Sequence, residues 1–278
     1  GAYGEVFINP TQRTFSIYEK KKKKYEEHIE ELKTFINKST ETADGKKVML
    51  AANIGGADEA AKAVKAGAEG VGLFRTEFLF LNKNALPTEE EQFEEYKKAA
   101  VLTKGMPLTI RTLDIGGDKD IPYMGLTKET NPFLGYRAIR FCLDRVDIFT
   151  TQLRAILRAS AYGSIRIMIP MITSVNEVRQ VKDMIKKICS DLDHNGISYD
   201  KNIQTGVMIE TPAAAIMADA IAQEVDFFSI GTNDLTQYTI AVDRCNENVA
   251  YLYSAFNPAV LRLIRRIIEC AHNAGIEA

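Results

Sequence analysis

Arginine side chains recur in this 278-residue chain at or soon after the ends of short apolar segments, Arg75 and Arg111 at the segment ends and Arg244 a few residues past Asn233 and Asp234. Arg75, Arg111 and Arg244 each carry a planar guanidinium group, whose parallel N–H donors match the oxygens of a phosphate or a carboxylate. Two or three arginines around one anion bind it far more strongly than single surface pairs do. These residues therefore predict an anion-binding site, provided that folding brings the apolar segments side by side.

Two carboxylates occupy equivalent positions. Glu210 ends the apolar segment 204–209, while Asp234, next to Asn233, follows the apolar segment 225–230. Because we expect these segments to form adjacent strands, both carboxylates can reach one hard cation. Oxygen ligands without histidine or cysteine favour Mg²⁺ or Mn²⁺ over zinc.

Each arginine also has a structural interpretation, as one half of an ion pair. Arg75 could pair with Glu77, and Arg111 with Asp114. Three arginines and two carboxylates on one edge are nevertheless harder to explain by stability alone. The glycines of DIGGDK could cradle a phosphate through backbone N–H groups, although a simple turn is the more common use of such a pair.

Apolar strands and amphipathic helices alternate along the chain and would position these side chains. Thr211 and Pro212 after Glu210 are typical of a helix start. Thr88 with Glu91, and Ser174 with Glu177, have the spacing of a capping box. The pattern predicts six strands, at 46–54, 70–80, 106–120, 164–172, 204–210 and 225–235. Helices are expected between them and at 257–275.

Strand–helix alternation with apolar strands indicates a parallel sheet covered by helices. Polar residues follow every strand, and no early GxGxxG turn is present, which favours a TIM-type (β/α)₈ barrel over a dinucleotide-binding fold. The chain stops just past the helix at 257–275, so we expect a barrel that lacks its last two strands. Residues 46–278 would form this barrel, and residues 1–45 an N-terminal segment with an exposed connector helix.

The composition gives no bulk charge to attract a polyanion. There are 35 basic and 37 acidic residues, for a net charge of −2, which argues against nucleic acid as a partner. The four cysteines show no CxxC spacing, which is typical of reduced thiols in a cytoplasm. No apolar run approaches the ~18 residues of a membrane span, so we expect a cytoplasmic protein without membrane insertion.

Five ordered motifs carry a resemblance to a known family. They are GLFRTEF (72–78), RTLDIGGDK (111–119), NPFLGYRAIR (131–140), IETPAA (209–214) and SIGTNDLTQY (229–238). Together they resemble the C-terminal phosphoenolpyruvate-binding barrel of enzyme I, the phosphoenolpyruvate-protein phosphotransferase family of the bacterial sugar phosphotransferase system. Pyruvate phosphate dikinase and phosphoenolpyruvate synthase share the barrel and the last two motifs, and stay open as alternatives.

The resemblance implies a role for each matching residue. Arg75, Arg111 and Arg244 would hold the phosphate of the substrate. The other substrate-binding residues would be Asn233, Asp234, Arg137 and Lys119. Glu210 and Asp234 would bind Mg²⁺. In such a site positioning and charge stabilise a loose, metaphosphate-like transition state.

The family's reaction needs groups that this chain does not match. The resemblance implies phosphoryl transfer to a histidine of an N-terminal domain, then to a phosphocarrier protein, with release of pyruvate to drive sugar uptake. His28, His194 and His272 lie outside the family's phosphoacceptor context, and Cys270 does not match its catalytic cysteine. We therefore expect no catalytic residue in this chain. It would bind phosphoenolpyruvate as part of a homodimeric enzyme or, alternatively, serve as a non-catalytic dimerisation fragment.

Overall fold

Six short parallel strands form the centre of the molecule. The computed structural model describes all residues except 1–3, 5, 37, 82, 117–120 and 126–128. The strands are β1 (Ala51–Ile54), β2 (Gly70–Arg75), β3 (Leu108–Arg111), β4 (Ile165–Ile169), β5 (Gln204–Ile209) and β6 (Phe228–Ile230). They lie in chain order in one sheet, and each strand pairs in parallel with the next. Phe227 also bridges in parallel to Glu277, which places the last described residues beside β6.

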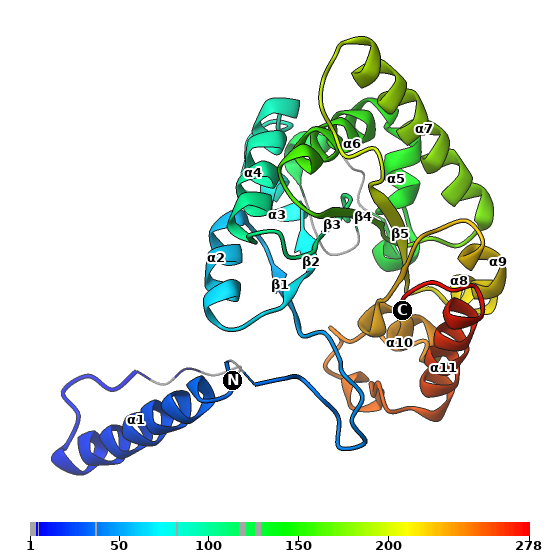
Figure 1. Ribbon diagram of the computed structural model, residues 1–278. Helices are drawn as coiled ribbons and strands as arrows, with labels where there is room; N and C mark the ends of the chain where they lie inside the picture. The colour runs from blue at the N-terminus through cyan, green and yellow to red at the C-terminus, as the bar shows by residue number, and fades with distance from the viewer. Residues whose placement is uncertain (1–3, 5, 37, 82, 117–120, 126–128) are drawn as a thin grey trace.

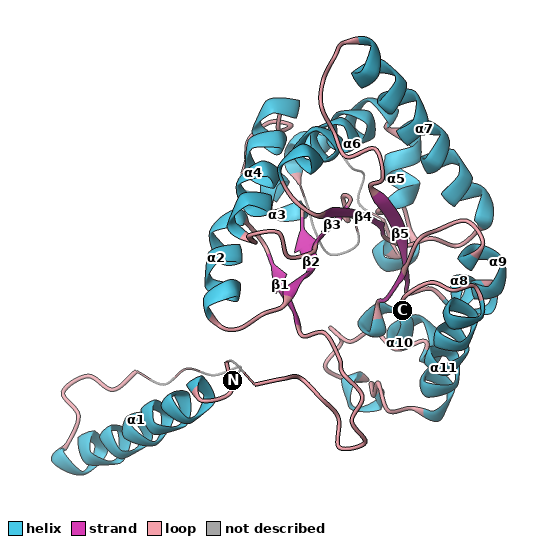
Figure 2. Ribbon diagram, viewed as in Figure 1, coloured by secondary structure: helices cyan, strands magenta, loops and turns pink. Residues whose placement is uncertain are grey.

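Helices surround the outer side of this curved sheet (Figure 1, Figure 2). In chain order they are α2 (Ala57–Lys65), α3 (Glu77–Leu81), α4 (Glu89–Leu102), α5 (Ile139–Asp144), α6 (Val146–Ala159), α7 (Val175–His194), α8 (Pro212–Ile216), α9 (Ala218–Ala222), α10 (Thr232–Ile240) and α11 (Pro258–Asn273). Strand–helix alternation thus produces the parallel α/β arrangement that the sequence predicts. That this arrangement belongs to a TIM-type (β/α)₈ barrel stays a prediction.

The main core lies between the sheet and the helices. Alternate strand residues such as Ile110, Ile167 and Val207 are buried there, because successive side chains of a strand point to opposite faces. The other face carries a smaller apolar cluster of Met168, Met208 and Phe227. Side chains at the strand ends that lie on the same face as this cluster therefore point into the interior of the curved sheet.

The second strand is shorter than the apolar run 70–80 suggests. β2 ends at Arg75, and Glu77 begins α3. The Thr76 hydroxyl donates to the carbonyl oxygen of Arg111 at 2.9 Å, which joins the turn to β3 where the strand pairing ends. Phe80, expected in the strand, is instead a fully buried residue of this short helix. Tertiary packing here outweighs the β-type pattern of the local sequence.

The predicted helix starts are confirmed. Thr88 and Glu91 form a capping box at α4, as Ser174 and Glu177 do at α7. Thr211 caps α8 by accepting from the backbone N–H of Ala214 at 3.1 Å. These caps fix where each helix leaves the carboxyl edge of the sheet.

The N-terminal helix α1 (Gln12–Lys33) lies apart from the sheet (Figure 1). None of its residues is buried, in agreement with an exposed connector helix. Three residues past its last residue, Ile36 lies against the backbone of Gly67. No helix in the described part of the chain is long and apolar enough to cross a membrane.

Candidate anion and metal site

A pocket of about 680 Å³ opens at the carboxyl ends of the strands. It contains the four arginines, two carboxylates and one amide that the sequence predicted and the structure describes, namely Arg75, Arg111, Arg137, Arg244, Glu210, Asp234 and Asn233. Lys119, also predicted, lies outside the described residues. Ligands of parallel α/β proteins commonly bind at this edge of the sheet.

Strand periodicity explains why these side chains point inward. Leu108 and Ile110 of β3 pack against the helices, so Arg111 faces the opposite side. In β5, Val207 and Ile209 pack outward, and Glu210 follows on the same side as Met208. Asp234 stands in the first turn of α10, which begins directly after β6.

Arg111 is held between two carboxylates. Its Nη2 donates to Glu77 Oε1 at 2.7 Å, and its Nη1 contacts Asp114 Oδ2 at 2.9 Å. All three side chains are buried. Burial lowers the pKa of Arg111, but the charges of Asp114, Glu77 and Glu210 outweigh burial and raise that pKa above its ordinary value.

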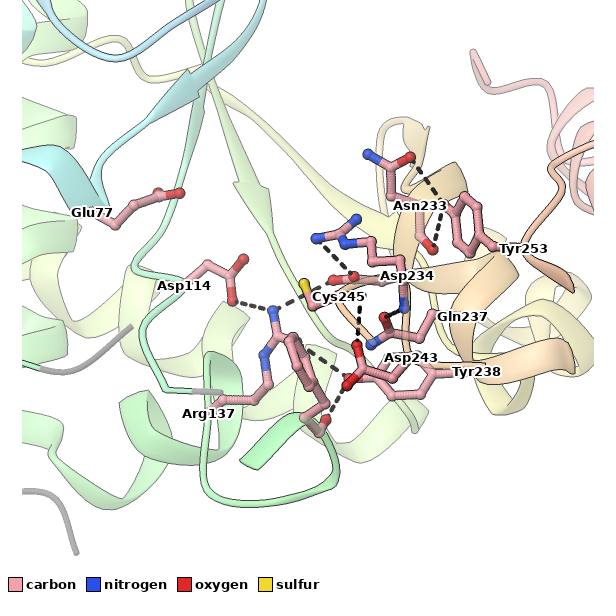
Figure 3. Close-up of polar contacts among 12 residues, drawn as sticks. Glu77, Asp114, Arg137, Asn233, Asp234, Gln237, Tyr238, Asp243, Cys245 and Tyr253 are labelled. Carbon is pink, nitrogen blue, oxygen red and sulfur yellow. Dashed lines mark hydrogen bonds and ion pairs between the residues drawn. The ribbon is translucent and has the colours of Figure 1, made fainter. Parts of the chain in front are cut away.

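Arg137 continues the same network (Figure 3). Its Nη2 donates to Asp114 Oδ1 at 2.9 Å and to Asp234 Oδ2 at 3.4 Å. Its Nη1 donates to the hydroxyl of Tyr238 at 3.2 Å. Burial opposes its positive charge, yet Asp114 and Asp234 raise the pKa of Arg137 above the ordinary range.

The backbone around Arg137 is shaped to bring it into the pocket. Ala138 has a φ of 50°, which is uncommon for a residue with a side chain. A Cβ atom added to Gly116 would lie 2.6 Å from the Cβ of Arg137, so only glycine allows this approach. Held by such local strain, Arg137 reaches Asp234 from a segment far away in the sequence.

Within the described residues, Arg75 and Arg244 have fewer charged neighbours than Arg111 and Arg137 have. The Arg75 guanidinium lies over the ring of Phe78, 5.0 Å from its centroid. Arg244 Nη2 lies 3.6 Å from Asp234 Oδ1, a contact too long for a hydrogen bond. Both arginines are therefore more available to an incoming anion than Arg111 and Arg137 are.

Glu210 is a buried carboxyl group. Its Oε1 accepts from the backbone N–H of Met171 at 2.7 Å. Burial, followed by the charges of Asp114 and Asp234, raises the pKa of Glu210 to about 8. A bound cation would offset both effects and favour the ionised carboxylate.

The pocket fits a magnesium ion in part. Among the described residues, no three histidine, cysteine or acidic side chains are grouped to hold a metal. Glu210 and Asp234 are two buried carboxylates on one pocket, however, and Asp234 Oδ1 accepts no hydrogen bond from the described residues. One or two carboxylates completed by substrate oxygens and water are a common magnesium environment.

Donors for an anion are present as well. The Nε atoms of Arg75, Arg111 and Arg137 are buried and have no hydrogen-bond partner in the described part of the chain. An unsatisfied buried donor costs about 1–3 kcal/mol, so a ligand that accepts from these atoms would stabilise the site. The structural pairs Arg111–Asp114 and Arg111–Glu77 thus coexist with a binding arrangement.

Other pocket residues were missed by sequence reasoning. Phe78 and Phe133 line the pocket and lie against the guanidinium groups of Arg75 and Arg137. Tyr238, which does not line the pocket, accepts a hydrogen bond from Arg137 and so ties it to α10. Aromatic residues beside each arginine motif were the only available signal, and apolar residues of this kind are equally typical of a core. His28, His194, His272 and Cys270 do not line this pocket.

Family comparison agrees with the fold and the pocket. The chain matches, over residues 29–278, the family described as PEP-utilising enzyme, PEP-binding domain, and it belongs to this family. Phosphoenolpyruvate-protein phosphotransferases of Bacillus sp. (strain S) and Geobacillus stearothermophilus are each 53% identical to it over 275 residues. That alignment covers 99% of this chain and 48% of each relative, so the chain spans about half the length of these proteins.

A solved structure supports the fold alone. The HpcH/HpaI aldolase/citrate lyase family protein from Burkholderia cenocepacia J2315 aligns with a TM-score of 0.50 and 12% sequence identity. The alignment covers 88% of this chain and 82% of that protein. The shared feature is the parallel α/β half-barrel.

Proposed function

We propose that this chain is the part of a phosphoenolpyruvate-protein phosphotransferase that binds phosphoenolpyruvate together with Mg²⁺. One observation carries the proposal: four arginines and two metal-type carboxylates from separate segments line one pocket at the carboxyl edge of the sheet. The family and the names of the relatives support the same substrate.

Each pocket residue then has a role. Arg75, Arg111 and Arg244 bind the phosphate, while Arg137, and Lys119 outside the described residues, add positive charge near it. Asn233 and Asp234 contact the substrate from the start of α10. Guanidinium groups held by carboxylates before the substrate arrives need little reorganisation to stabilise negative charge on the transferring phosphoryl group.

Glu210 and Asp234 would hold the magnesium ion. When bound, Mg²⁺ neutralises charge on the substrate oxygens and lowers the barrier to phosphoryl transfer. The residues of the chain orient the substrate so that its phosphorus faces an acceptor outside this pocket. Binding and orientation are therefore the contributions that we assign to this chain.

The acceptor belongs to the remainder of the enzyme. Cleavage of the phosphoenolpyruvate P–O bond would form an N–P bond on a histidine of an N-terminal domain, and protonation of the enolate would give pyruvate. The phosphoryl group would pass to a phosphocarrier protein and drive sugar uptake. A labelled-phosphate assay on the full-length enzyme tests this, and failure to label any histidine would reject it.

The larger organisation is also a proposal. We assign residues 46–278 to a (β/α)₈-type phosphoenolpyruvate-binding barrel, residues 1–45 to a connector, and the enzyme to the cytoplasm. Tyr251 and Phe256 are 80% and 83% exposed, and such an aromatic surface fits a homodimer interface. Sedimentation of the chain with Phe256→Asp tests this, since an unchanged mass would exclude Phe256 from the interface.

Calorimetric titration of phosphoenolpyruvate into the chain tests the substrate. We expect binding with Mg²⁺ and a loss of at least ~10-fold in affinity with excess chelator, because two buried carboxylates are then left without a cation. Arg111→Ala should abolish binding in a chain that still folds but is less stable, because buried Glu77 and Asp114 lose this partner. Arg179→Ala, which alters a surface ion pair, should bind normally. A folded chain that binds under neither condition would reject the proposal.

A further inference from the structure

The short helix α3 contacts the two arginines that end neighbouring strands. Glu77, its first residue, accepts from Arg111 Nη2 at 2.7 Å. Phe78, its second, lies under the guanidinium of Arg75, whose carbon is 5.0 Å from the ring centroid. We propose that α3 is the positioning element of the anion site, and that Glu77 and Phe78 fix Arg111 and Arg75 in their binding orientations. The proposal rests on the function assigned above and adds two residues to it.

α3 is anchored firmly enough to do this. Phe80 is fully buried, and its carbonyl oxygen accepts from the Tyr123 hydroxyl at 2.7 Å. Directly before the helix, the Thr76 hydroxyl donates to the Arg111 carbonyl oxygen at 2.9 Å. Both the backbone and the side chain of Arg111 are therefore bonded to the turn between β2 and α3. A residue held through both its backbone and its side chain loses little further entropy when it binds a ligand.

Phe78 is fixed from its other side. A Cβ atom added to Gly55 would lie 2.8 Å from the Phe78 ring, so the ring lies directly on the backbone that follows β1. The ring thus fills the space between Gly55 and Arg75. Through α3, the ends of β1, β2 and β3 are joined around the arginine pair.

The charge of Glu77 and its positioning of Arg111 should have opposite effects on the affinity for an anion. Glu77 is an acidic residue in a pocket that would receive an anion, so its charge by itself weakens binding. Its benefit must come from the hydrogen bond that orients Arg111. Two substitutions separate these effects: Glu77→Gln keeps the reach and an acceptor oxygen without the charge, and Glu77→Asp keeps the charge but shortens the reach.

Calorimetric titration of phosphoenolpyruvate with Mg²⁺ into these variants is the test. Only Glu77→Asp loses the hydrogen bond to the charged Arg111 side chain, so we expect this variant to bind phosphoenolpyruvate about 10-fold more weakly than the unmodified chain. Glu77→Gln should stay within about 3-fold of the unmodified chain. Glu224 makes an equally short contact of 2.7 Å to Arg179 outside the pocket, and Glu224→Asp should leave the affinity unchanged. Normal affinity in Glu77→Asp with tighter binding in Glu77→Gln would overturn the proposal for Glu77.

Phe78 is tested separately. Phe78→Leu keeps an apolar side chain but removes the aromatic face, and should weaken binding about 2–5-fold, the size of a partly exposed cation–π contact. Phe78→Tyr, which retains the face, should bind like the unmodified chain. Equal affinities for Phe78→Leu and Phe78→Tyr would overturn the role of Phe78.

A ligand-free readout keeps this inference distinct from the proposed function. The Arg111 Nε–H signal in a ¹⁵N-arginine spectrum, identified by its absence in Arg111→Lys, should be sharp in the unmodified chain and in Glu77→Gln. It should be broadened in Glu77→Asp. If the unmodified chain binds no phosphoenolpyruvate, the function fails, yet this signal still reports on positioning. Identical Arg111 Nε–H signals in the unmodified chain, Glu77→Gln and Glu77→Asp would overturn the positioning role of Glu77.

Discussion

Opposite charges alternate through the pocket at the level of single residues. The order runs from Glu77 through Arg111, Asp114 and Arg137 to Asp234, with successive contacts of 2.7, 2.9, 2.9 and 3.4 Å. Buried charges need such partners, because removing one partner of a buried pair costs about 3–5 kcal/mol. The network therefore keeps two guanidinium groups charged and oriented before any ligand arrives.

Glu210 should make the metal-free protein sensitive to pH. Its pKa is raised from 4.5 to about 8 in the folded state, so between these values the folded chain holds a proton that the unfolded chain has released. The free energy of unfolding should therefore fall as the pH rises through this window and level off above it. Denaturant titrations at several pH values with excess chelator measure this slope.

Glu210→Gln is the matched variant for this prediction. Its amide stays neutral at every pH, so the contribution of this position to the slope disappears. Its stability should exceed that of the unmodified chain most clearly near pH 8. Parallel pH curves for the two proteins would show that Glu210 titrates normally in the folded chain.

Sequence reasoning reached the arginines but not their neighbours. Arg75, Arg111 and Glu210 could be placed because strand ends of a parallel sheet share one edge. Whether Glu77 and Asp114 stabilise or take part in a site was left open, since the answer depends on which strand ends are in contact. The structure confirms the Arg111–Asp114 pair, and it places Glu77, which the sequence paired with Arg75, on Arg111. The second contact depends on how β2 and β3 lie side by side, which the sequence does not give.

At the scale of elements, the turn from β6 into α10 closes tightly over Glu210. A Cβ atom on Gly231 would lie 2.5 Å from the Cβ of Glu210 and 2.6 Å from its Oε2. Gly231 N also donates to the Ile209 carbonyl oxygen at 3.1 Å, which holds the turn beside β5. The turn has room for Glu210 only because position 231 carries no side chain.

Gly231→Ala should therefore displace Glu210. Because the clash is with a Cβ atom and cannot be relieved by a rotamer change, we expect a stability loss of about 1–3 kcal/mol and a loss of magnesium-dependent binding. Calorimetry and thermal unfolding measure the two effects. Gly56→Ala is the control: Gly56 is also an N-cap glycine, but its added Cβ would meet Glu95 at an ordinary 3.4 Å. Normal magnesium-dependent binding by Gly231→Ala would show that the turn yields without moving Glu210.

Local signals predicted the elements well where a cap marks their start. The capping boxes at Thr88 and Ser174, and the Thr211–Pro212 start of α8, required only sequence spacing. The apolar run 70–80 carried no such mark, so its division into β2 and α3 could not be found from periodicity. That division is decided by the burial of Phe80 and by the bond from Thr76 to β3.

At the scale of the whole molecule, α1 adds no residue to the hydrophobic core. It contains no buried residue, and its ion pairs, such as Lys22–Glu26, lie on exposed surface. Exposed pairs of this kind contribute about 0–1 kcal/mol. Beyond the helix, Ile36 lies against the backbone of Gly67 at the end of α2.

A chain without residues 1–33 should thus unfold with the same free energy as the full chain, within about 0.5 kcal/mol, because only exposed surface is removed. A chain without residues 1–40 also loses Ile36 and should be less stable by about 1–2 kcal/mol. Denaturant unfolding compares the three proteins, and titration with phosphoenolpyruvate should give one affinity for all of them. If the deletion of residues 1–33 already destabilises the chain, sedimentation identifies the cause. A simultaneous loss of the dimer would place α1 in the interface between two copies. An unchanged mass would show that α1 packs on its own barrel.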